Sequence, residues 1–195
     1  MKLKSEALRQ QILTAATTII VNEGLTAVST VKVAKAVKTP QSNIYSYFQN
    51  KEALLLAVFA AHQQRLIEAL TSVLDETLSP KEKLHQLVTA MVQLGLAHPD
   101  TIRIILLFRQ QPEWRPRLPK NSDSAFFTAI FTQFAQLQQQ QIVKPYDASF
   151  LAEGVFSIIT NYLIAIDAGE LTTTALSQAD LMTLVDDFLL MPDYR

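Results

Sequence analysis

The sequence predicts an all-α fold, and three observations carry this prediction. Apolar residues recur at every third or fourth position through most of the chain, which is the spacing that places them on one face of a helix. Only four of the 195 residues are glycine, and no pair of segments shows the alternating pattern of a β-hairpin. We therefore expect about nine helices, divided between a three-helix head in residues 1–50 and a larger helical body in residues 51–195.

The first helix is predicted to begin near Ser5, whose hydroxyl can cap the first turn, and to end at Gly24. Its start carries three basic residues that phosphate groups or solvent can reach, Lys2, Lys4 and Arg9. Its buried face is a stripe at helical spacing: Leu8, Ile12, Ala15, Ala16, Ile19 and Ile20.

Two short helices follow, separated by a tight turn. The first begins at Ser29 or Thr30 and buries Val33, Ala34 and Val37, which leaves Lys32, Lys35 and Lys38 for solvent or phosphate. The second is expected to use Thr39 as its cap and Pro40 as its first helical residue, where a missing N–H has no cost.

The two sides of this second short helix differ in chemistry. At about 100° per residue, Ile44, Tyr47 and Phe48 fall on one side, and Gln41, Ser42, Tyr45 and Ser46 fall on the other. A helix with a buried apolar side and an exposed polar side can enter the major groove of DNA, where Gln41 could bond an adenine edge in bidentate fashion. The next helix opens at Asn50 and Lys51, and a helix start with a lysine can hold a phosphate.

The rest of the chain reads as further helices. One long helix is expected from Lys51 to about Leu78, and it belongs to both head and body. The segment Pro112–Pro119 is too rich in proline to be helical. The remaining helices are predicted at about 80–98, 99–111, 123–141, 147–168 and 174–191.

Charge is segregated along the chain, although the net charge is only −1. Residues 1–55 hold seven Lys and Arg against three Asp and Glu, whereas the remainder holds ten against fifteen. A basic head on an acidic body is the distribution that contact with double-stranded DNA at one end requires.

At these residues the chain resembles the TetR family of bacterial transcriptional regulators. Val33-Ala34 and the block Ile44-Tyr45-Ser46-Tyr47-Phe48-Gln49-Asn50-Lys51 match the family's pattern at its spacing, over about the first third of the chain. The sequence departs from the pattern at Val37-Lys38-Thr39-Pro40, where the family usually has Ala-Gly-Val-Ser. The resemblance implies a ligand-responsive regulator, expected to be a repressor, that binds a palindromic operator as a homodimer. The absence of cysteine gives no reason to expect an oxidising compartment, so a cytoplasmic location is expected. It also implies that the long helix relays effector binding to the DNA. The residues expected to face DNA are Gln41, Ser42, Asn43, Tyr45 and Ser46 toward the groove, with Thr30, Lys32 and Lys51 on phosphates.

The last two helices carry more apolar surface than one subunit can cover, which predicts a homodimer through a four-helix bundle. The alternative is that these faces form the core of a single chain. The expected dimer residues are Phe150, Leu151, Val155, Ile158, Ile159, Tyr162, Leu181, Leu184, Val185 and Phe188.

An effector pocket is expected where aromatic residues gather between the middle and the final helices. Aromatic residues at helical spacing also form ordinary core, so each is only a candidate for lining a largely apolar pocket. The candidates are Phe108, Trp114, Phe127, Phe131, Asn161 and Tyr162.

We expect no enzymatic activity, no cofactor and no metal site. The chain has no cysteine, its three histidines stand on different segments, and its scattered glycines cannot build a phosphate loop. No secretory signal is visible and the uncharged run 124–143 carries six glutamines, so neither secretion nor a membrane span is expected. The competing hypothesis is a small-molecule binding protein that kept the scaffold but no longer reads an operator; a helical enzyme comes third.

Overall fold

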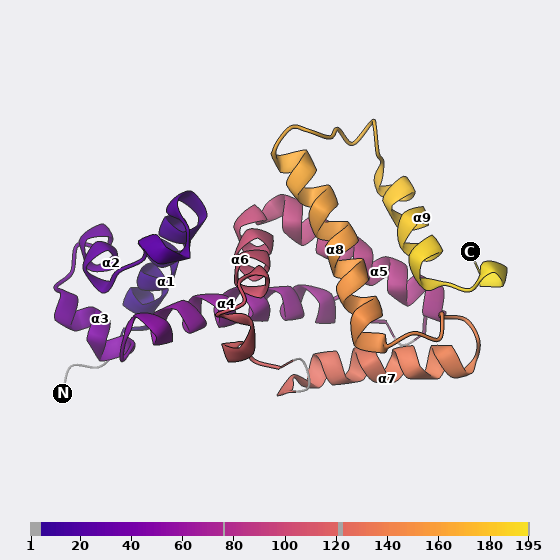
Figure 1. Ribbon diagram of the computed structural model, residues 1–195, viewed down its shortest axis with the longest axis horizontal. Coiled ribbons are helices and arrows are strands. Elements are labelled where there is room, and N and C mark those ends of the chain that lie inside the picture. Colours follow the sequence, from indigo (N-terminus) through magenta and orange to yellow (C-terminus); the bar gives the residue numbers. More distant parts are fainter. Residues whose placement is uncertain (1–4, 76, 121–122, 195) are drawn as a thin grey trace. The chain divides into compact units, whose positions relative to one another are not determined.

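The computed structural model describes residues 5–75, 77–120 and 123–194, and within these ranges it contains nine α-helices and no strand (Figure 1). Short 3-10 turns lie at Leu25–Ala27, Arg115–Arg117 and Pro192–Tyr194. The predicted all-α class is confirmed. The helices are α1 (Glu6–Glu23), α2 (Thr30–Ala36), α3 (Gln41–Tyr47), α4 (Lys51–Thr71), α5 (Pro80–Ala97), α6 (Pro99–Gln110), α7 (Ala125–Gln139), α8 (Ala148–Asp167) and α9 (Gln178–Leu189).

The chain divides into two compact units. The first comprises the residues up to Arg65 together with Asp100–Leu118, and so contains α1, α2, α3, most of α4 and nearly all of α6. The second comprises Leu66–Pro99 and Pro119–Arg195, and contains α5, α7, α8 and α9. The boundary between the two compact units therefore lies inside α4, after Arg65. The division into a DNA-binding head, residues 1–50, and a body, residues 51–195, stays a prediction about function.

The core of the first unit is built from the apolar stripes that the sequence predicts. Helix α2 packs against both α1 and α3, and each of the three contributes side chains that are almost fully buried. Removing such side chains from water stabilises the head, at about 1.5–3 kcal/mol for each large aliphatic residue. The buried set includes Ile12, Leu13, Ala16, Ile20, Val33, Ile44, Leu54 and Val58.

Side chains within three residues of a helix start cap most of these helices. The hydroxyls of Ser5 and Ser29 accept hydrogen bonds from the backbone N–H groups of Leu8 and Lys32, and the Asn50 side chain accepts one from Ala53. Gly24, at a φ of 88°, follows the last residue of α1. These four predicted helix ends are confirmed.

Three predicted boundaries are wrong. Helix α3 begins at Gln41 and not at Pro40, which has an extended ψ of 143° and stands in the cap position expected for Thr39. Helix α4 ends at Thr71 and not near Leu78, because Asp75 bonds the backbone and hydroxyl of Thr77 in a local turn. Helix α9 begins at Gln178 and not near Thr174.

Reciprocal serine caps fix the starts of α5 and α9. The hydroxyls of Ser79 and Ser177 cap the backbone N–H groups of Glu82 and Asp180, whose carboxylates bond back to the serine N–H groups. The hydrogen bonds from the serine hydroxyls, and to a smaller extent those from the serine N–H groups, lower the pKa of Glu82 and of Asp180. Each start is therefore set by its own four-residue motif.

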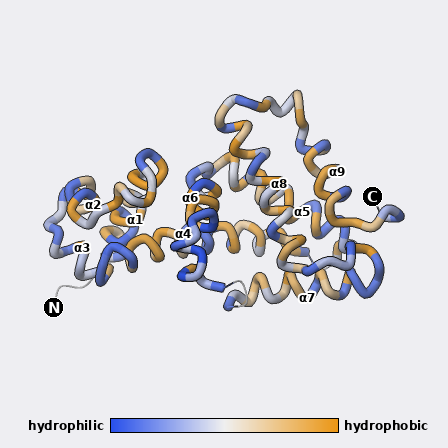
Figure 2. Tube along the Cα trace, in the orientation of Figure 1, coloured by the Kyte–Doolittle hydropathy of each residue, from blue (hydrophilic) through white to orange (hydrophobic). Residues whose placement is uncertain are grey.

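In the second unit, α8 lies against α5, α7 and α9 (Figure 1). Two glycines allow close contacts with it: a Cβ added at Gly95 would lie 2.3 Å from the Leu163 side chain, and one added at Gly154 would lie 2.3 Å from the Phe188 ring. The close approach at Gly154 is thus made within the chain, by α9. Figure 2 shows hydrophobic residues, in orange, along α8.

The turn between α2 and α3 places a lysine in a left-handed conformation. Lys38 has a φ of 52°, and its N–H and that of Thr39 bond back to the carbonyl groups of Lys35 and Ala34, which is a Schellman motif. Gly169 occupies the same position after α8, at a φ of 72°. A side chain with a Cβ is strained there by on the order of 1 kcal/mol.

We predict that Lys38→Gly raises the melting temperature by about 2 °C, because glycine removes this strain. The measurement is thermal unfolding followed by circular dichroism. Lys35→Gly is the matched control: it places glycine inside helix α2 and should lower the melting temperature. An unchanged or lowered value for Lys38→Gly would contradict a left-handed residue 38.

Candidate nucleic-acid interface

Helix α3 has one buried side and one exposed side, as its sequence predicts. Ile44 is 0% exposed and Phe48, directly after the helix, is 5% exposed. Ser42 and Ser46 are exposed, and the large side chain of Tyr45 is 50% exposed. The polar side of α3 is therefore free to meet a partner.

The C-terminal end of α3 is fastened to the start of α1. The hydroxyl of Tyr47 accepts a hydrogen bond from the backbone N–H of Ser5 at 2.8 Å and donates one to the carbonyl of Ser5 at 3.1 Å. The guanidinium of Arg9 lies 5.9 Å from the centre of the Phe48 ring. These contacts hold α3 in a fixed orientation within the head.

A polar triangle joins α2 to the exposed side of α3. The amide nitrogen of Gln41 donates to the hydroxyl of Thr30 at 2.8 Å and lies 3.4 Å from the hydroxyl of Tyr45, while the Thr30 hydroxyl donates to that of Tyr45 at 3.3 Å. Thr30 is only 7% exposed. It therefore lies beneath the predicted DNA-facing residues, whereas the sequence suggests a direct phosphate contact for it.

The other predicted DNA-facing residues make local hydrogen bonds. The Asn43 amide donates to the Thr39 hydroxyl at 2.6 Å, and the Ser46 hydroxyl donates to the Asn43 carbonyl at 2.7 Å. Lys32 pairs with Glu23, and the ammonium group of Lys51 donates to the carbonyl of Thr26 at 3.1 Å. Exposed pairs of this kind contribute about 0–1 kcal/mol, so a phosphate can compete for both lysines.

A buried histidine links three helices of the first unit, and sequence reasoning missed it. The Nε2 atom of His62 on α4 lies 3.0 Å from the hydroxyl of Thr17 on α1, and its Nδ1 atom lies 3.1 Å from the hydroxyl of Thr101 on α6. Arg65 also donates to that hydroxyl, at 3.2 Å. Burial, aided by the charge of Arg65 and opposed by that of Asp100, lowers the pKa of His62 from 6.5 to about 4.

This histidine should make stability fall on acidification. As the pH drops below 6.5 the unfolded chain takes up a proton that folded His62 takes up only near pH 4, so the folded state loses about 3 kcal/mol between these values. Urea unfolding of the wild type and of His62→Gln, at pH 7 and at about pH 4.5, measures this loss. His62→Gln should show a smaller difference between the two pH values, whereas His98→Gln, which removes an exposed histidine, should keep the wild-type difference. Equal differences for wild type and His62→Gln would contradict the assignment.

The six predicted pocket residues are divided between the two compact units. Phe108 and Trp114 belong to the first unit, where both are buried. The centre of the Phe108 ring lies 5.5 Å from that of Phe59 and 5.3 Å from that of Trp114. The other four belong to the second unit. There Phe127 stacks on Phe131, Tyr162 is buried and Asn161 is exposed.

A cleft of about 200 Å³ lies between α5 and α7 of the second unit. Five apolar side chains line it, Leu84, Leu87, Ile130, Phe134 and Leu137, with Lys83 and three glutamines around them. None of the six predicted pocket residues lines this cleft. The sequence feature that indicates this cleft is the helical spacing of the apolar residues on α5 and on α7, which gives each helix an apolar face.

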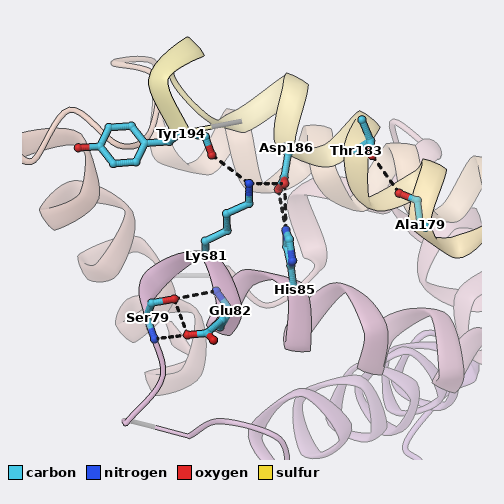
Figure 3. Close-up of polar contacts among 8 residues, drawn as sticks. All are labelled: Ser79, Lys81, Glu82, His85, Ala179, Thr183, Asp186 and Tyr194. Atoms are coloured by element: carbon cyan, nitrogen blue, oxygen red, sulfur yellow. Dashed lines mark hydrogen bonds and ion pairs between the residues drawn. The ribbon is translucent and has the colours of Figure 1, made fainter.

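A charged cluster joins α5 to α9, shown in Figure 3. Asp186 on α9 is 7% exposed, and its carboxylate lies 2.8 and 3.0 Å from Nε2 of His85 and 3.1 Å from the ammonium group of Lys81. Lys81 also donates to the carbonyl of Tyr194. The sequence does not predict this cluster, because Asp186 is 101 residues from His85 and still farther from Lys81. Among the described residues, no three Asp, Glu, His or Cys side chains are grouped so as to hold a metal ion.

The predicted dimer residues are divided between the core of the chain and its surface. Phe150 is 67% exposed and Leu184 47% exposed, and Val155, Ile158 and Phe188 are half-buried. The other five are buried within the single chain, as the alternative interpretation expects. These five are Leu151, Ile159, Tyr162, Leu181 and Val185, each at most 5% exposed.

Known proteins share both the head sequence and the complete fold. Residues 12–58 match the profile of the bacterial regulatory proteins of the tetR family. A curated relative, the fatty acid metabolism regulator protein of Bacillus subtilis (strain 168), is 34% identical over 74 residues, so the match spans 38% of the chain and 38% of that relative. Two solved structures share the fold. A TetR family transcription regulator from Marinobacter aquaeolei VT8 covers 97% of this chain and 99% of its own, with a TM-score of 0.82 at 22% identity. A TetR-family transcriptional regulator from Haemophilus influenzae RD covers 96% and 100%, with a TM-score of 0.75 at 17% identity.

Proposed function

Because the N-terminal domain is that of the TetR family of bacterial regulatory proteins, we propose that the chain is a cytoplasmic, ligand-responsive repressor. It binds a palindromic operator as a homodimer, and a small, largely apolar effector releases it. In this proposal residues 1–50 form the DNA-binding head, and residues 51–195 form the ligand-binding and dimerisation body.

The observation that carries the proposal is the orientation of α3. Its apolar side chains are buried in the head, whereas Ser42, Tyr45 and Ser46 are exposed and Gln41 and Asn43 are half-buried. A major groove about 12 Å wide admits one helix whose outward side chains reach bases and phosphates. Lys51, four residues after the last residue of α3, adds positive charge at the start of α4.

DNA binding is tested by fluorescence anisotropy with duplexes from around the chain's own gene, at about 50 and 200 mM salt. We expect specific binding that weakens steeply with salt, because phosphate contacts release counterions. Lys51→Ala should reduce the salt slope by about one, and Tyr45→Ala should weaken binding about tenfold.

Two controls keep this test interpretable. Lys120→Ala removes an exposed lysine of the second unit and should leave binding unchanged. Sedimentation confirms that each variant keeps the wild-type assembly. If Tyr45→Ala and Lys51→Ala bind as the wild type does, the head does not read DNA through α3 and the competing small-molecule binding protein is favoured.

The homodimer is proposed from the apolar surface that the chain leaves exposed on its last two helices. By length and composition α8 could cross a membrane, a property that core helices of soluble proteins share. Only 33% of the 18-residue apolar stretch of α8 that meets this criterion is buried within the chain. Phe150, Ile164 and Leu184 remain exposed on α8 and α9. A second copy that presents the same surface can cover them with two-fold symmetry, and this symmetry would favour a palindromic operator.

We predict that Leu184→Glu, alone or with Phe150→Glu, converts the dimer to a monomer, because a buried unpaired carboxylate is strongly disfavoured. Analytical ultracentrifugation measures the mass. Leu96→Glu is the control, because Leu96 is 52% exposed on α5 and not on the proposed surface. A wild-type monomer, or a Leu184→Glu variant that stays dimeric, would contradict the proposed surface.

The cleft between α5 and α7 is our candidate for the effector site. Its apolar walls and its rim of glutamines and Lys83 suit a ligand with an apolar chain and a polar head. The curated relative is named for the regulation of fatty acid metabolism, so fatty acids are the first probes to use. They should raise the melting temperature of the wild type but not of Leu87→Trp, which fills the cleft; an equal rise in both would exclude this site.

A further inference from the structure

We infer that Thr30 and Tyr45 fix the amide of Gln41 so that its carbonyl oxygen, and not its nitrogen, is presented to the base edges. Gln41 would then read an exposed amino group, on adenine or cytosine, at one position of each half-site. This inference rests on the proposed DNA-binding function. It differs from the bidentate contact with adenine that the sequence suggests.

The geometry engages both N–H groups of the Gln41 amide in contacts within the head. The amide nitrogen lies 2.8 Å from the Thr30 hydroxyl and 3.4 Å from the Tyr45 hydroxyl. An amide nitrogen has two N–H donors, and these two oxygen atoms take up both of them. The amide oxygen has no part in the triangle, so it is the atom left for a partner.

The Thr30 hydroxyl decides which way the amide is turned. It is 7% exposed and donates its own hydrogen to Tyr45 at 3.3 Å, so it offers Gln41 a lone pair. With the amide turned over, only the two hydroxyl hydrogens of Thr30 and Tyr45 would be left to bridge the three groups, so the triangle would hold at most two hydrogen bonds in place of three. The hydrogen bonds thus run in one direction, from Gln41 to Thr30 to Tyr45, and each strengthens the next.

This direction also sets what Tyr45 can do. Since its oxygen accepts from Thr30, its own O–H is left to donate outward, and Tyr45 is 50% exposed. A phosphate oxygen is an acceptor that such a donor can meet. One chain of hydrogen bonds therefore prepares a base acceptor on Gln41 and a phosphate donor on Tyr45.

The major groove offers only two kinds of base donor, the amino groups of adenine and of cytosine. The oxygen atoms of guanine and thymine are acceptors, and they would repel an outward amide oxygen. An amide held in this way accepts adenine and cytosine about equally and rejects guanine and thymine. A freely turning glutamine would instead prefer adenine, because it could donate to one atom of that base and accept from another.

The test is selection of binding sites from a randomised duplex library by the full-length chain. The wild type is compared with two variants, Thr30→Val and Thr30→Ser. The wild type should show one position per half-site where adenine and cytosine are within about threefold of each other and both exceed guanine and thymine about tenfold. Thr30→Val keeps the shape of the side chain but removes the hydroxyl, so Gln41 can turn and adenine should exceed cytosine there by about tenfold. Thr30→Ser restores the hydroxyl and should restore the wild-type pattern.

A second measurement needs no DNA, so it separates this inference from the proposed function. In the free protein the side-chain amide protons of Gln41, followed by NMR, should exchange with water several times more slowly in the wild type and in Thr30→Ser than in Thr30→Val. Similar exchange in all three proteins, or a wild type that selects adenine alone, would overturn the inference while leaving DNA binding intact. A wild type that selects no sequence at all would overturn the proposed function and the readout with it.

Discussion

The burial of Ile44 and Phe48 is the constraint on which the proposed interface depends. Helix α3 has only seven residues, and so short a helix does not persist in water by itself. Its conformation is held because these two side chains are at most 5% exposed and because Tyr47 is bonded to the backbone of Ser5. The same burial turns Gln41 and Tyr45 outward, so the packing of the head and the chemistry of its surface have one cause.

Each compact unit also contains one polar cluster that joins helices distant in sequence. In the first unit neutral His62 bonds hydroxyls on α1 and α6, and in the second unit the buried carboxylate of Asp186 is neutralised by Lys81 beside His85. Buried polar groups are costly unless they are paired, so these clusters favour one arrangement of helices over other packings of the same apolar faces. Within each unit they specify how the helices pair, whereas the apolar core supplies most of the stability.

The parts of the fold that were predictable are those encoded within a few residues. The caps at Ser5, Ser29 and Asn50 each act on an N–H three residues away, and the apolar stripes repeat within one turn. The parts that were missed need tertiary neighbours: Thr17 and His62 are 45 residues apart, and nothing local marks them as partners. Phe108 and Trp114 illustrate the same limit, because aromatic residues at helical spacing look alike whether they line a pocket or, as here, pack in a core.

The central claim is that the polar side of α3 enters the major groove, and backbone amide NMR of the chain with a duplex that it selects tests this most directly. We predict that the largest chemical-shift changes on adding DNA fall in residues 41–46 and at the start of α4, near residues 50–53. If these amides keep their free positions while others change, the chain binds DNA through a different surface and the account is wrong.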